Sequence, residues 1–484
     1  MKTQKEHLKT QKFHVKAPDN WVNDPNGFIY YNGNYHLFYQ YFPYEPRWGT
    51  MHWGHAVSRD LVTWEHKGIA LYPSTYEDRN GCFSGSAIEV NGRLVLVYTG
   101  VRYEVVNPED PHTCLNEQFE SAQLMISSED GFHFDNENGK TVIIPPVTDQ
   151  QLGHRTHTRD PKIWRGKDAW YLILGSTVEK PCGDAGGESA VNPVGDTAGE
   201  SAGDAAVKSV VEHAEHPCGE VLFYRSEDLH HWAYVNRAWK GPDYGWMWEC
   251  PDFFETEEGG VLLVSPMGFL KNGEKQQDQA ICFPVNFEEN TCQMEIPDAY
   301  QFTDYGMDLY APQTTADAEG RRVMAAWIRM PQPTKDRWIG MFCSPRVVER
   351  KGNHIYFRMH PNVRAAYSRE ITHIAQASPE GCMAVFDLAD GGTADIGGFL
   401  IKREGNQIRT DRSAVYPSFE GAHLLSETPE LKEGCTLEVL VDENLIEIYI
   451  NNGEYVISNA VYGLGKQLQV NGSSSLRLYT ADND

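Results

Sequence analysis

The chain has 484 residues, of which 68 are acidic and 42 basic, so its formal net charge is −26 at pH 7. This excess of negative charge argues against nucleic acid or an anionic membrane surface as a partner. A hydrophobic content of 40% is that of a globular protein, and the length predicts two domains.

The N-terminal segment 1–7 carries lysines without an apolar run behind them, and no stretch approaches the roughly 18 apolar residues of a membrane helix. We therefore expect no secretory signal, no membrane span and a cytoplasmic location. The ten cysteines lack metal-ligand spacing. We expect free thiols, although Cys182 and Cys218 could pair if oxidised.

Five repeats organise the chain up to about residue 345. In each, a short strand, a turn with glycine and an apolar strand follow one another. The five turns are Asn32-Gly33, Asn91-Gly92, Arg165-Gly166, Gly259-Gly260 and Glu319-Gly320. Three repeats continue with a serine, an aspartate and an aromatic residue at equal offsets, in 58–64, 128–134 and 226–232. Four strands per repeat predict a five-bladed β-propeller over residues 1–345.

One gap between repeats is longer than the others. Residues 178–217 are rich in Gly, Ala, Asp, Glu and Ser, and 183–190 nearly duplicates 195–202. This composition cannot bury a core, so we expect a mobile acidic insert, in which a short helix near 207–214 could form. We expect a linker at 346–360, and short strands without helices over 361–484 predict a C-terminal β-sandwich.

Three acidic residues are expected to meet at the propeller axis. The first strand of each blade lines the central channel, and Asp24, Asp160 and Glu249 stand on three such strands, in motifs that share a proline. Repulsion and burial should raise the pKa of at least one carboxyl group and leave a protonated acid beside ionised partners. Glycosidic bond cleavage needs this arrangement. A calcium site built from the same oxygens is the competing interpretation.

Aromatic and polar residues near these acids are suited to binding a sugar. Aromatic faces stack on sugar rings, and amides, hydroxyls and guanidinium groups bind their hydroxyls. The candidate aromatic residues are Trp21, Trp48, Phe83, Trp246, Trp248 and Trp327, and the candidate polar residues are Asn23, Gln40, Ser84 and Arg159. For most of the 12 tryptophans, packing in the core is the better interpretation.

Three motifs in order resemble glycoside hydrolase family 32, the invertases, sucrose-6-phosphate hydrolases and fructanases. They are Trp21-Val22-Asn23-Asp24-Pro25-Asn26-Gly27, Arg159-Asp160-Pro161 and Trp248-Glu249-Cys250-Pro251. Further matches are Trp48-Gly49, Phe83-Ser84-Gly85-Ser86 and Tyr310-Ala311-Pro312-Gln313. The resemblance covers about residues 13 to 360 well and the remainder loosely. It implies a five-bladed propeller joined to a β-sandwich, and retaining hydrolysis of terminal β-D-fructofuranosides such as sucrose, sucrose 6-phosphate or short fructooligosaccharides.

The resemblance also implies roles for individual residues. Asp24 is similar to the nucleophile that forms a fructosyl-enzyme, Glu249 to the general acid/base, and Asp160 to the residue that binds fructose hydroxyls and stabilises the transition state. The residues expected to bind substrate are Asn23, Gln40, Trp48, Phe83, Ser84, Arg159, Tyr310 and Trp327. The chain departs from the family pattern at Val22 and Thr158 and in the acidic insert, but at none of the three acids.

No metal or organic cofactor is implied. The expected partner is a small-molecule fructoside, and the sandwich domain could form a homodimer. Two alternatives remain open at this point. One is an inverting arabinanase- or xylosidase-like hydrolase, and the other is a non-catalytic propeller whose acids only bind sugar hydroxyls.

Overall fold

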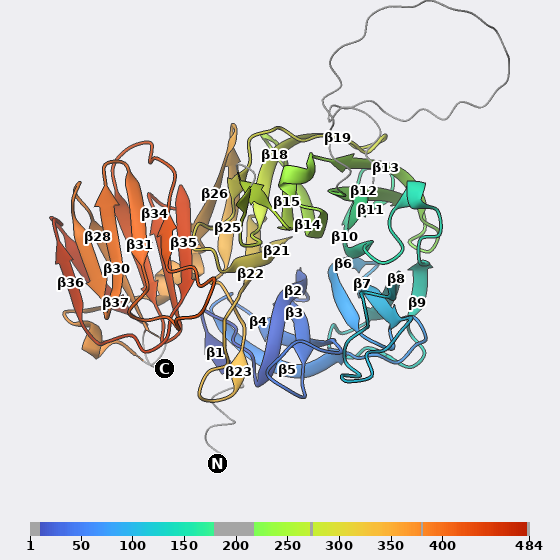
Figure 1. Ribbon diagram of the computed structural model, residues 1–484, viewed down its shortest axis with the longest axis horizontal. Helices are drawn as coiled ribbons and strands as arrows, with labels where there is room; N and C mark the ends of the chain where they lie inside the picture. The colour runs from blue at the N-terminus through green and yellow to red at the C-terminus, as the bar shows by residue number, and fades with distance from the viewer. Residues whose placement is uncertain (1–9, 179–216, 272–273, 379–380, 482–484) are drawn as a thin grey trace, which may run out of the picture.

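The computed structural model describes residues 10–178, 217–271, 274–378 and 381–481. Two parts built almost wholly of strands lie side by side, a ring of five sheets and a sandwich of two (Figure 1). The acidic insert expected between residues 178 and 217, with its short helix and Cys182, lies outside the described residues. Within those residues, no helix has the length and apolar character needed to cross a membrane.

Each blade of the ring is an antiparallel sheet whose strands follow one another in the chain. Blade one holds β2 (Asn20–Tyr31), β3 (Asn34–Phe42), β4 (His52–Ser58) and β5 (Thr63–Leu71), and blade two holds β6 (Cys82–Val90), β7 (Arg93–Tyr103), β8 (Phe119–Ser128) and β9 (Thr141–Ile144). Blade three holds β10 (Arg159–Arg165), β11 (Trp170–Val178), β12 (Cys218–Ser226) and β13 (Ala233–Trp239). Blade four holds β14 (Met247–Thr256), β15 (Gly259–Met267), β18 (Ile281–Glu288) and β19 (Gln293–Glu295), and blade five holds β21 (Leu309–Ala316), β22 (Arg322–Ile328), β25 (Arg346–Lys351) and β26 (His354–Met359). The five-bladed propeller predicted from the repeats is confirmed.

The fifth blade corrects one expected boundary. Residues 346–360 are not a linker, because β25 pairs with β22 through Val347 and Val323, and β26 pairs with β25 along its whole length. Ile355 and Phe357 are buried in the same core cluster as Val323 and Ala325 of β22. The chain leaves the propeller after β26 and enters the sandwich through the short helix α2 (Pro361–Ala366).

The serine and aspartate that recur at equal offsets in three repeats form the same turn each time. After β4, the Ser58 hydroxyl accepts from the backbone N–H of Leu61 at 2.8 Å, and the Asp60 carboxylate accepts from Val62 and Thr63 at 2.9 and 2.8 Å. Equivalent bonds follow β8 and β12, at residues 128–133 and 226–231. Side-chain capping of backbone donors explains why the offsets recur in the sequence.

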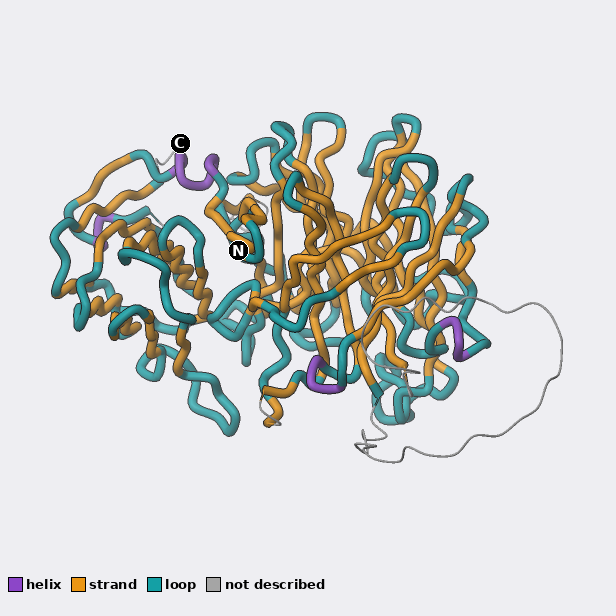
Figure 2. Tube along the Cα trace, turned by 90° about the horizontal axis from the view of Figure 1, so that it is seen from above, coloured by secondary structure: helices purple, strands orange, loops and turns teal. Residues whose placement is uncertain are grey.

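The sandwich packs two sheets around a core of aliphatic residues. Its six-stranded sheet holds β27 (Arg369–Ile371), β37 (Leu476–Thr480), β28 (Cys382–Asp387), β33 (Thr436–Val441), β34 (Leu445–Ile450) and β35 (Tyr455–Ala460). Its five-stranded sheet holds β32 (Leu425–Glu427), β31 (Gln407–Asp411), β30 (Phe399–Glu404), β29 (Thr393–Ile396) and β36 (Leu468–Asn471). The strand β35 lies on the side of the sandwich that faces the propeller (Figure 1), and Figure 2 shows the two parts side by side from above.

The N-terminal segment closes the ring. The strand β1 (Thr10–Lys12) pairs with β5, the outer strand of blade one. Between β22 and β25, the chain forms β23 (Trp338–Ile339), which pairs in parallel with β2, and β24 (Met341–Phe342), which pairs with β22. The backbone N–H of Phe342 donates to the carbonyl of Val15 at 2.8 Å. Blades one and five are therefore joined by main-chain hydrogen bonds.

Buried ion pairs join the sandwich to the propeller. His14 lies between Asp442 and Glu447, with Nδ1–Oδ2 and Nε2–Oε2 distances of 2.9 and 2.8 Å. Glu447 also binds the guanidinium of Arg346 at 2.7 Å, and Arg346 reaches Asp304 at 2.8 Å. Because every one of these charges has an opposite partner, the interface can bury them, whereas removing one partner would leave an unpaired charge.

Candidate active site

In all five inner strands, the pairing register shifts at the sequence motif that carries the predicted site residues. These shifts determine which side chains reach the site. The shifts lie between Val22 and Pro25, Cys82 and Gly85, Arg159 and Lys162, Glu249 and Asp252, and Tyr310 and Gln313. In blades three to five, the residue before the proline has positive φ, at 64° for Asp160, 46° for Cys250 and 51° for Ala311. Proline cannot donate to the ladder, and such bulges redirect side chains. Consecutive residues of each strand therefore reach the channel.

The bulges present two tiers of side chains. One tier consists of Asp24, Ser84, Asp160, Cys250 and Ala311, and the tier one residue earlier consists of Asn23, Phe83, Arg159, Glu249 and Tyr310. Hydrogen bonds link Asp24 to Ser84 in one tier, and Glu249 to Arg159 and Tyr310 in the other. The three predicted acids thus share one site, but Glu249 occupies the earlier tier while Asp24 and Asp160 occupy the later one.

Asp24 is partly buried at the end of the channel. The Ser84 hydroxyl donates to its Oδ2 at 2.6 Å, and the Cys250 thiol lies 3.5 Å from the same oxygen. Burial raises the pKa of Asp24 above its ordinary value; the Ser84 hydrogen bond opposes this effect, and the negative charge of Glu249 adds to it.

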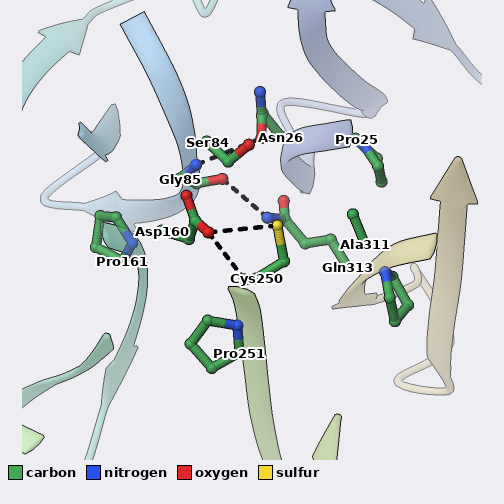
Figure 3. A pocket seen from close by; sticks show the side chains of 11 residues that line it. Pro25, Asn26, Ser84, Gly85, Asp160, Pro161, Cys250, Pro251, Ala311 and Gln313 are labelled. Atoms are coloured by element: carbon green, nitrogen blue, oxygen red, sulfur yellow. Dashed lines mark hydrogen bonds between the residues drawn. The ribbon is translucent and has the colours of Figure 1, made fainter. Parts of the chain in front are cut away.

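Asp160 is held more tightly (Figure 3). The backbone N–H of Cys250 donates to its Oδ2 at 2.9 Å, and its own N–H donates to the Thr99 hydroxyl at 2.9 Å. Burial raises the pKa of Asp160 to about 7, with Arg159 opposing the shift and Glu249 contributing to it. The expected upward displacement of a carboxyl pKa therefore falls on Asp24 and Asp160.

Glu249 has both carboxylate oxygens fixed. Arg159 Nη2 donates to Oε1 at 2.9 Å, and the Tyr310 hydroxyl donates to Oε2 at 2.7 Å. The Glu249 side chain is nevertheless 24% exposed, against 6% for Asp160. Of these two carboxylates, Glu249 is thus the one that an incoming molecule meets more readily.

Polar groups next to the acids tie the blades together, and Figure 3 draws one of these bonds, between Gln313 and Gly85. The Gln313 amide donates to the carbonyl of Gly85 at 2.8 Å and accepts from the N–H of Phe28 at 2.8 Å. Lys162 binds Asp252 at 2.8 Å. The remaining space is a cavity of about 10 Å³, which is room for one water molecule. Residues of all five inner strands line this cavity.

The other predicted substrate-binding residues surround this centre to different degrees. Trp48, 37% exposed, and Phe83 are in ring contact at 5.8 Å. Gln40 donates to the carbonyl of Cys82 at 3.0 Å, and Asn23 accepts from the indole of Trp21 at 2.8 Å. The bond of Gln40 holds its amide two residues before Ser84, and Asn23 directly precedes Asp24 in the sequence.

Two tryptophans of the predicted sugar surface have different surroundings, and Trp327, half-buried and paired in register with Tyr310, stays a prediction. Trp327 contacts Trp21 edge-on at 5.8 Å and packs against the propeller core. Trp248 is fully buried, and its indole donates to the carbonyl of Tyr244 at 2.8 Å. A sugar cannot stack on a buried ring, so Trp248 is a core residue and its assignment to the sugar surface is wrong.

Three contacts of the site were not expected from the sequence, namely those of Cys250, Thr99 and His157. Cys250 lies between Asp24 and Asp160, Thr99 accepts from the Asp160 backbone, and His157 binds Arg159 at 3.0 Å. Aligning the five inner motifs on their prolines would have placed Cys250 in the tier of Asp24 and Asp160. Among the residues that the structure describes, no three His, Cys, Asp or Glu side chains form a group that could hold a metal ion.

Comparisons with known proteins agree with this geometry. The model of the glycosyl hydrolases family 32 N-terminal domain matches residues 14–185 and 202–361, and that of the family 32 C-terminal domain matches residues 369–483. A sucrose-6-phosphate hydrolase of Bacillus subtilis is 29% identical, with 95% of this chain and 90% of that protein aligned. A raffinose invertase of Escherichia coli is 30% identical, with 96% and 91% aligned.

A solved structure shares the whole architecture. The GH32 beta-fructofuranosidase of Bombyx mori superimposes with a TM-score of 0.76 and 26% identity, over 99% of this chain and 98% of that one. The fold, the two matching family models and the relatives lead to the same conclusion. The chain belongs to glycosyl hydrolase family 32 and is a hydrolase of the β-fructofuranosidase type.

Proposed function

We propose that this hydrolase cleaves terminal β-D-fructofuranosides, such as sucrose, sucrose 6-phosphate or short fructooligosaccharides, with retention of configuration. The observation that carries the proposal is the unequal treatment of two carboxylates. Asp24 has a hydroxyl and a thiol beside one oxygen, whereas Glu249 has both oxygens bound, one by the guanidinium of Arg159 and the other by the hydroxyl of Tyr310. The curated relatives include proteins named for sucrose 6-phosphate and for raffinose, which supports sucrose-type substrates.

In the first step, Glu249 in its carboxylic acid form transfers its proton to the leaving oxygen, while the ionised carboxylate of Asp24 attacks C2 of the fructosyl group. The glycosidic bond breaks, and a covalent fructosyl-enzyme forms through an oxocarbenium-like transition state. Asp160 accepts hydrogen bonds from fructose hydroxyls, and its carboxylate stabilises the positive charge that develops. Asp160 keeps its orientation through the Cys250 and Thr99 bonds.

In the second step, Glu249 removes a proton from water, which attacks C2 and releases Asp24. Asp24 must be ionised to attack. Since burial raises its pKa, activity should fall on acidification at a higher pH than for an ordinary aspartate.

Fructose release tests the proposal, with sucrose, sucrose 6-phosphate and a kestose compared side by side. Asp24→Asn and Glu249→Gln should each lose at least about 10³-fold in kcat. Their circular dichroism and thermal midpoint should stay close to those of the unmodified chain, because both changes keep the size of the side chain. Turnover near the original level in either variant would contradict the assignment.

Product stereochemistry separates retention from inversion. Proton NMR during the first turnovers should show β-fructofuranose before mutarotation. An initial α-anomer would instead favour an inverting hydrolase. Binding of fructosides without release of fructose would favour a propeller that only binds sugar.

A further inference from the structure

His157 lies on a short loop that two blades hold in place. The His154 ring accepts from the backbone N–H groups of Thr156 and His157, each at 3.1 Å. Ser121 of β8 donates to the carbonyl of Thr156 at 2.7 Å, and Gln123 of β8 donates to that of Thr158 at 2.9 Å. These bonds fix the backbone immediately before β10, so the position of His157 is set independently of its side chain.

Two aromatic rings fix the plane of the His157 imidazole. Phe119 and Trp246 meet it nearly at right angles, with centroid separations of 6.0 and 5.1 Å and interplanar angles of 85° and 83°. The ring of His154 lies 4.8 Å away. Only 12% of the His157 side chain is exposed. The imidazole therefore has little freedom to turn.

The His157 ring accepts a hydrogen bond from Arg159. Nδ1 lies 3.0 Å from Arg159 Nη1, and a guanidinium has donors only, so Nδ1 must be unprotonated. The ring proton is on Nε2, which lies 3.7 Å from the Glu117 carboxylate. Burial lowers the pKa of His157 to about 3, and the charges of Arg159 and His154 act in the same direction. His157 is thus a neutral acceptor at neutral pH.

The bond to His157 leaves the remaining donors of Arg159 for the carboxylates. Nη2 binds Glu249 at 2.9 Å, and Nε lies 3.9 Å from Asp160. A planar guanidinium can serve both acids at once only while its plane is fixed. Without an acceptor at Nη1, a buried donor would be unsatisfied, and Arg159 would turn to find another partner.

We propose that His157 is a positioning residue, whose ring nitrogen fixes the guanidinium of Arg159 and thereby the carboxylate of Glu249. The inference rests on the proposed function. His157 touches neither acid itself, and its effect on the reaction passes through Arg159. Nothing in its immediate sequence, Thr156-His157-Thr158, would indicate this role, because the contacts come from three other loops or strands.

Two amide variants test the inference. In His157→Asn, the amide oxygen can occupy the place of Nδ1 and accept from Arg159, whereas in His157→Gln it reaches the place of Nε2 instead. We expect His157→Gln to lower kcat about 10²-fold, with a smaller change in KM, since misplacing a catalytic group by about 1 Å has that effect. We expect His157→Asn to keep kcat within about tenfold of the unmodified enzyme.

The pH profile supplies a readout that a merely structural role would not move. Arg159 opposes the raised pKa of Asp160, so a loosened guanidinium lets that pKa rise further. The acid limb of kcat/KM should therefore move to higher pH in His157→Gln and stay in place in His157→Asn. Glu117→Gln, which changes only the charge near Nε2, is the matched control and should leave kcat and the acid limb unchanged.

Equal kcat values and acid limbs in the two amide variants would overturn the inference, whether both are active or both impaired. Thermal midpoints show whether each variant is folded at the assay temperature. A failure of the proposed function is distinguishable, because the unmodified enzyme would then release no fructose from any of the three sugars.

Discussion

His14 should make the stability of this protein depend on pH in a predictable window. Burial opposes its charged form, but hydrogen bonds to Asp442 and Glu447 prevail and raise the pKa of His14 from 6.5 to about 9. One pKa unit corresponds to about 1.36 kcal/mol, so protonation of His14 contributes about 3 kcal/mol to the folded state.

The sign follows from the raised pKa. The contribution is complete below pH 6.5, where His14 is protonated in both states, and it is lost as pH rises through about 9. The pKa of Glu447 is lowered to about 2 despite its burial, chiefly by the hydrogen bond from His14, and that contribution is lost only on acidification below about 4.5. The contact between the domains should be strongest between pH 4.5 and 6.5.

Urea unfolding followed by tryptophan fluorescence, from pH 5.5 to 9.5, measures this effect. We expect His14→Gln to be less stable than the unmodified chain by about 3 kcal/mol at pH 6 and the difference to shrink towards pH 9.5. Groups that titrate elsewhere cancel in the comparison. His133→Gln, at a histidine that is 89% exposed, is the control and should change little. Parallel pH profiles for His14→Gln and the unmodified chain would refute the reasoning.

Two further changes probe the partners of the acids. Ser84→Ala removes a hydrogen bond that lowers the pKa of Asp24, so the acid limb of kcat/KM should move to higher pH. An unmoved limb would show that Ser84 does not tune Asp24, or that Asp160, whose pKa is also raised, sets the acid limb instead. Tyr310→Phe removes the 2.7 Å bond to Glu249 and should lower kcat about tenfold to hundredfold, as steady-state kinetics would show. An unchanged kcat would mean that Arg159 alone orients Glu249.

Much of the propeller could be predicted because its signals are local. Turns with glycine and serine–aspartate caps mark the strand ends, and prolines mark the bulges that carry Asp24 and Asp160. The last two strands of blade five were not predicted from these signals. His354–Met359 alternates as any sandwich strand does, and only its pairing with β25, and that of β25 with β22, assigns it to the propeller.

The three acids at the centre of the site could be predicted because their signals are also local, whereas the residues that hold these acids in place could not. Asp24, Asp160 and Glu249 belong to short motifs, but the bond from Arg159 to His157 depends on rings from blades two and four. Trp248, by contrast, was predicted to contribute to the sugar surface and does not. Its neighbour Glu249 reaches the channel, and because side chains alternate along a strand, Trp248 turns into the core instead.

The closure of the ring has a consequence for how the chain is made. His14 meets partners 428 and 433 residues further along the sequence. On the ribosome, blade one is complete long before blade five and the sandwich have been synthesised. Until then the segment around Val15 has neither Phe342 nor Glu447 to bind. The ring therefore cannot close through these contacts until blade five and the sandwich strand that carries Glu447 have been synthesised.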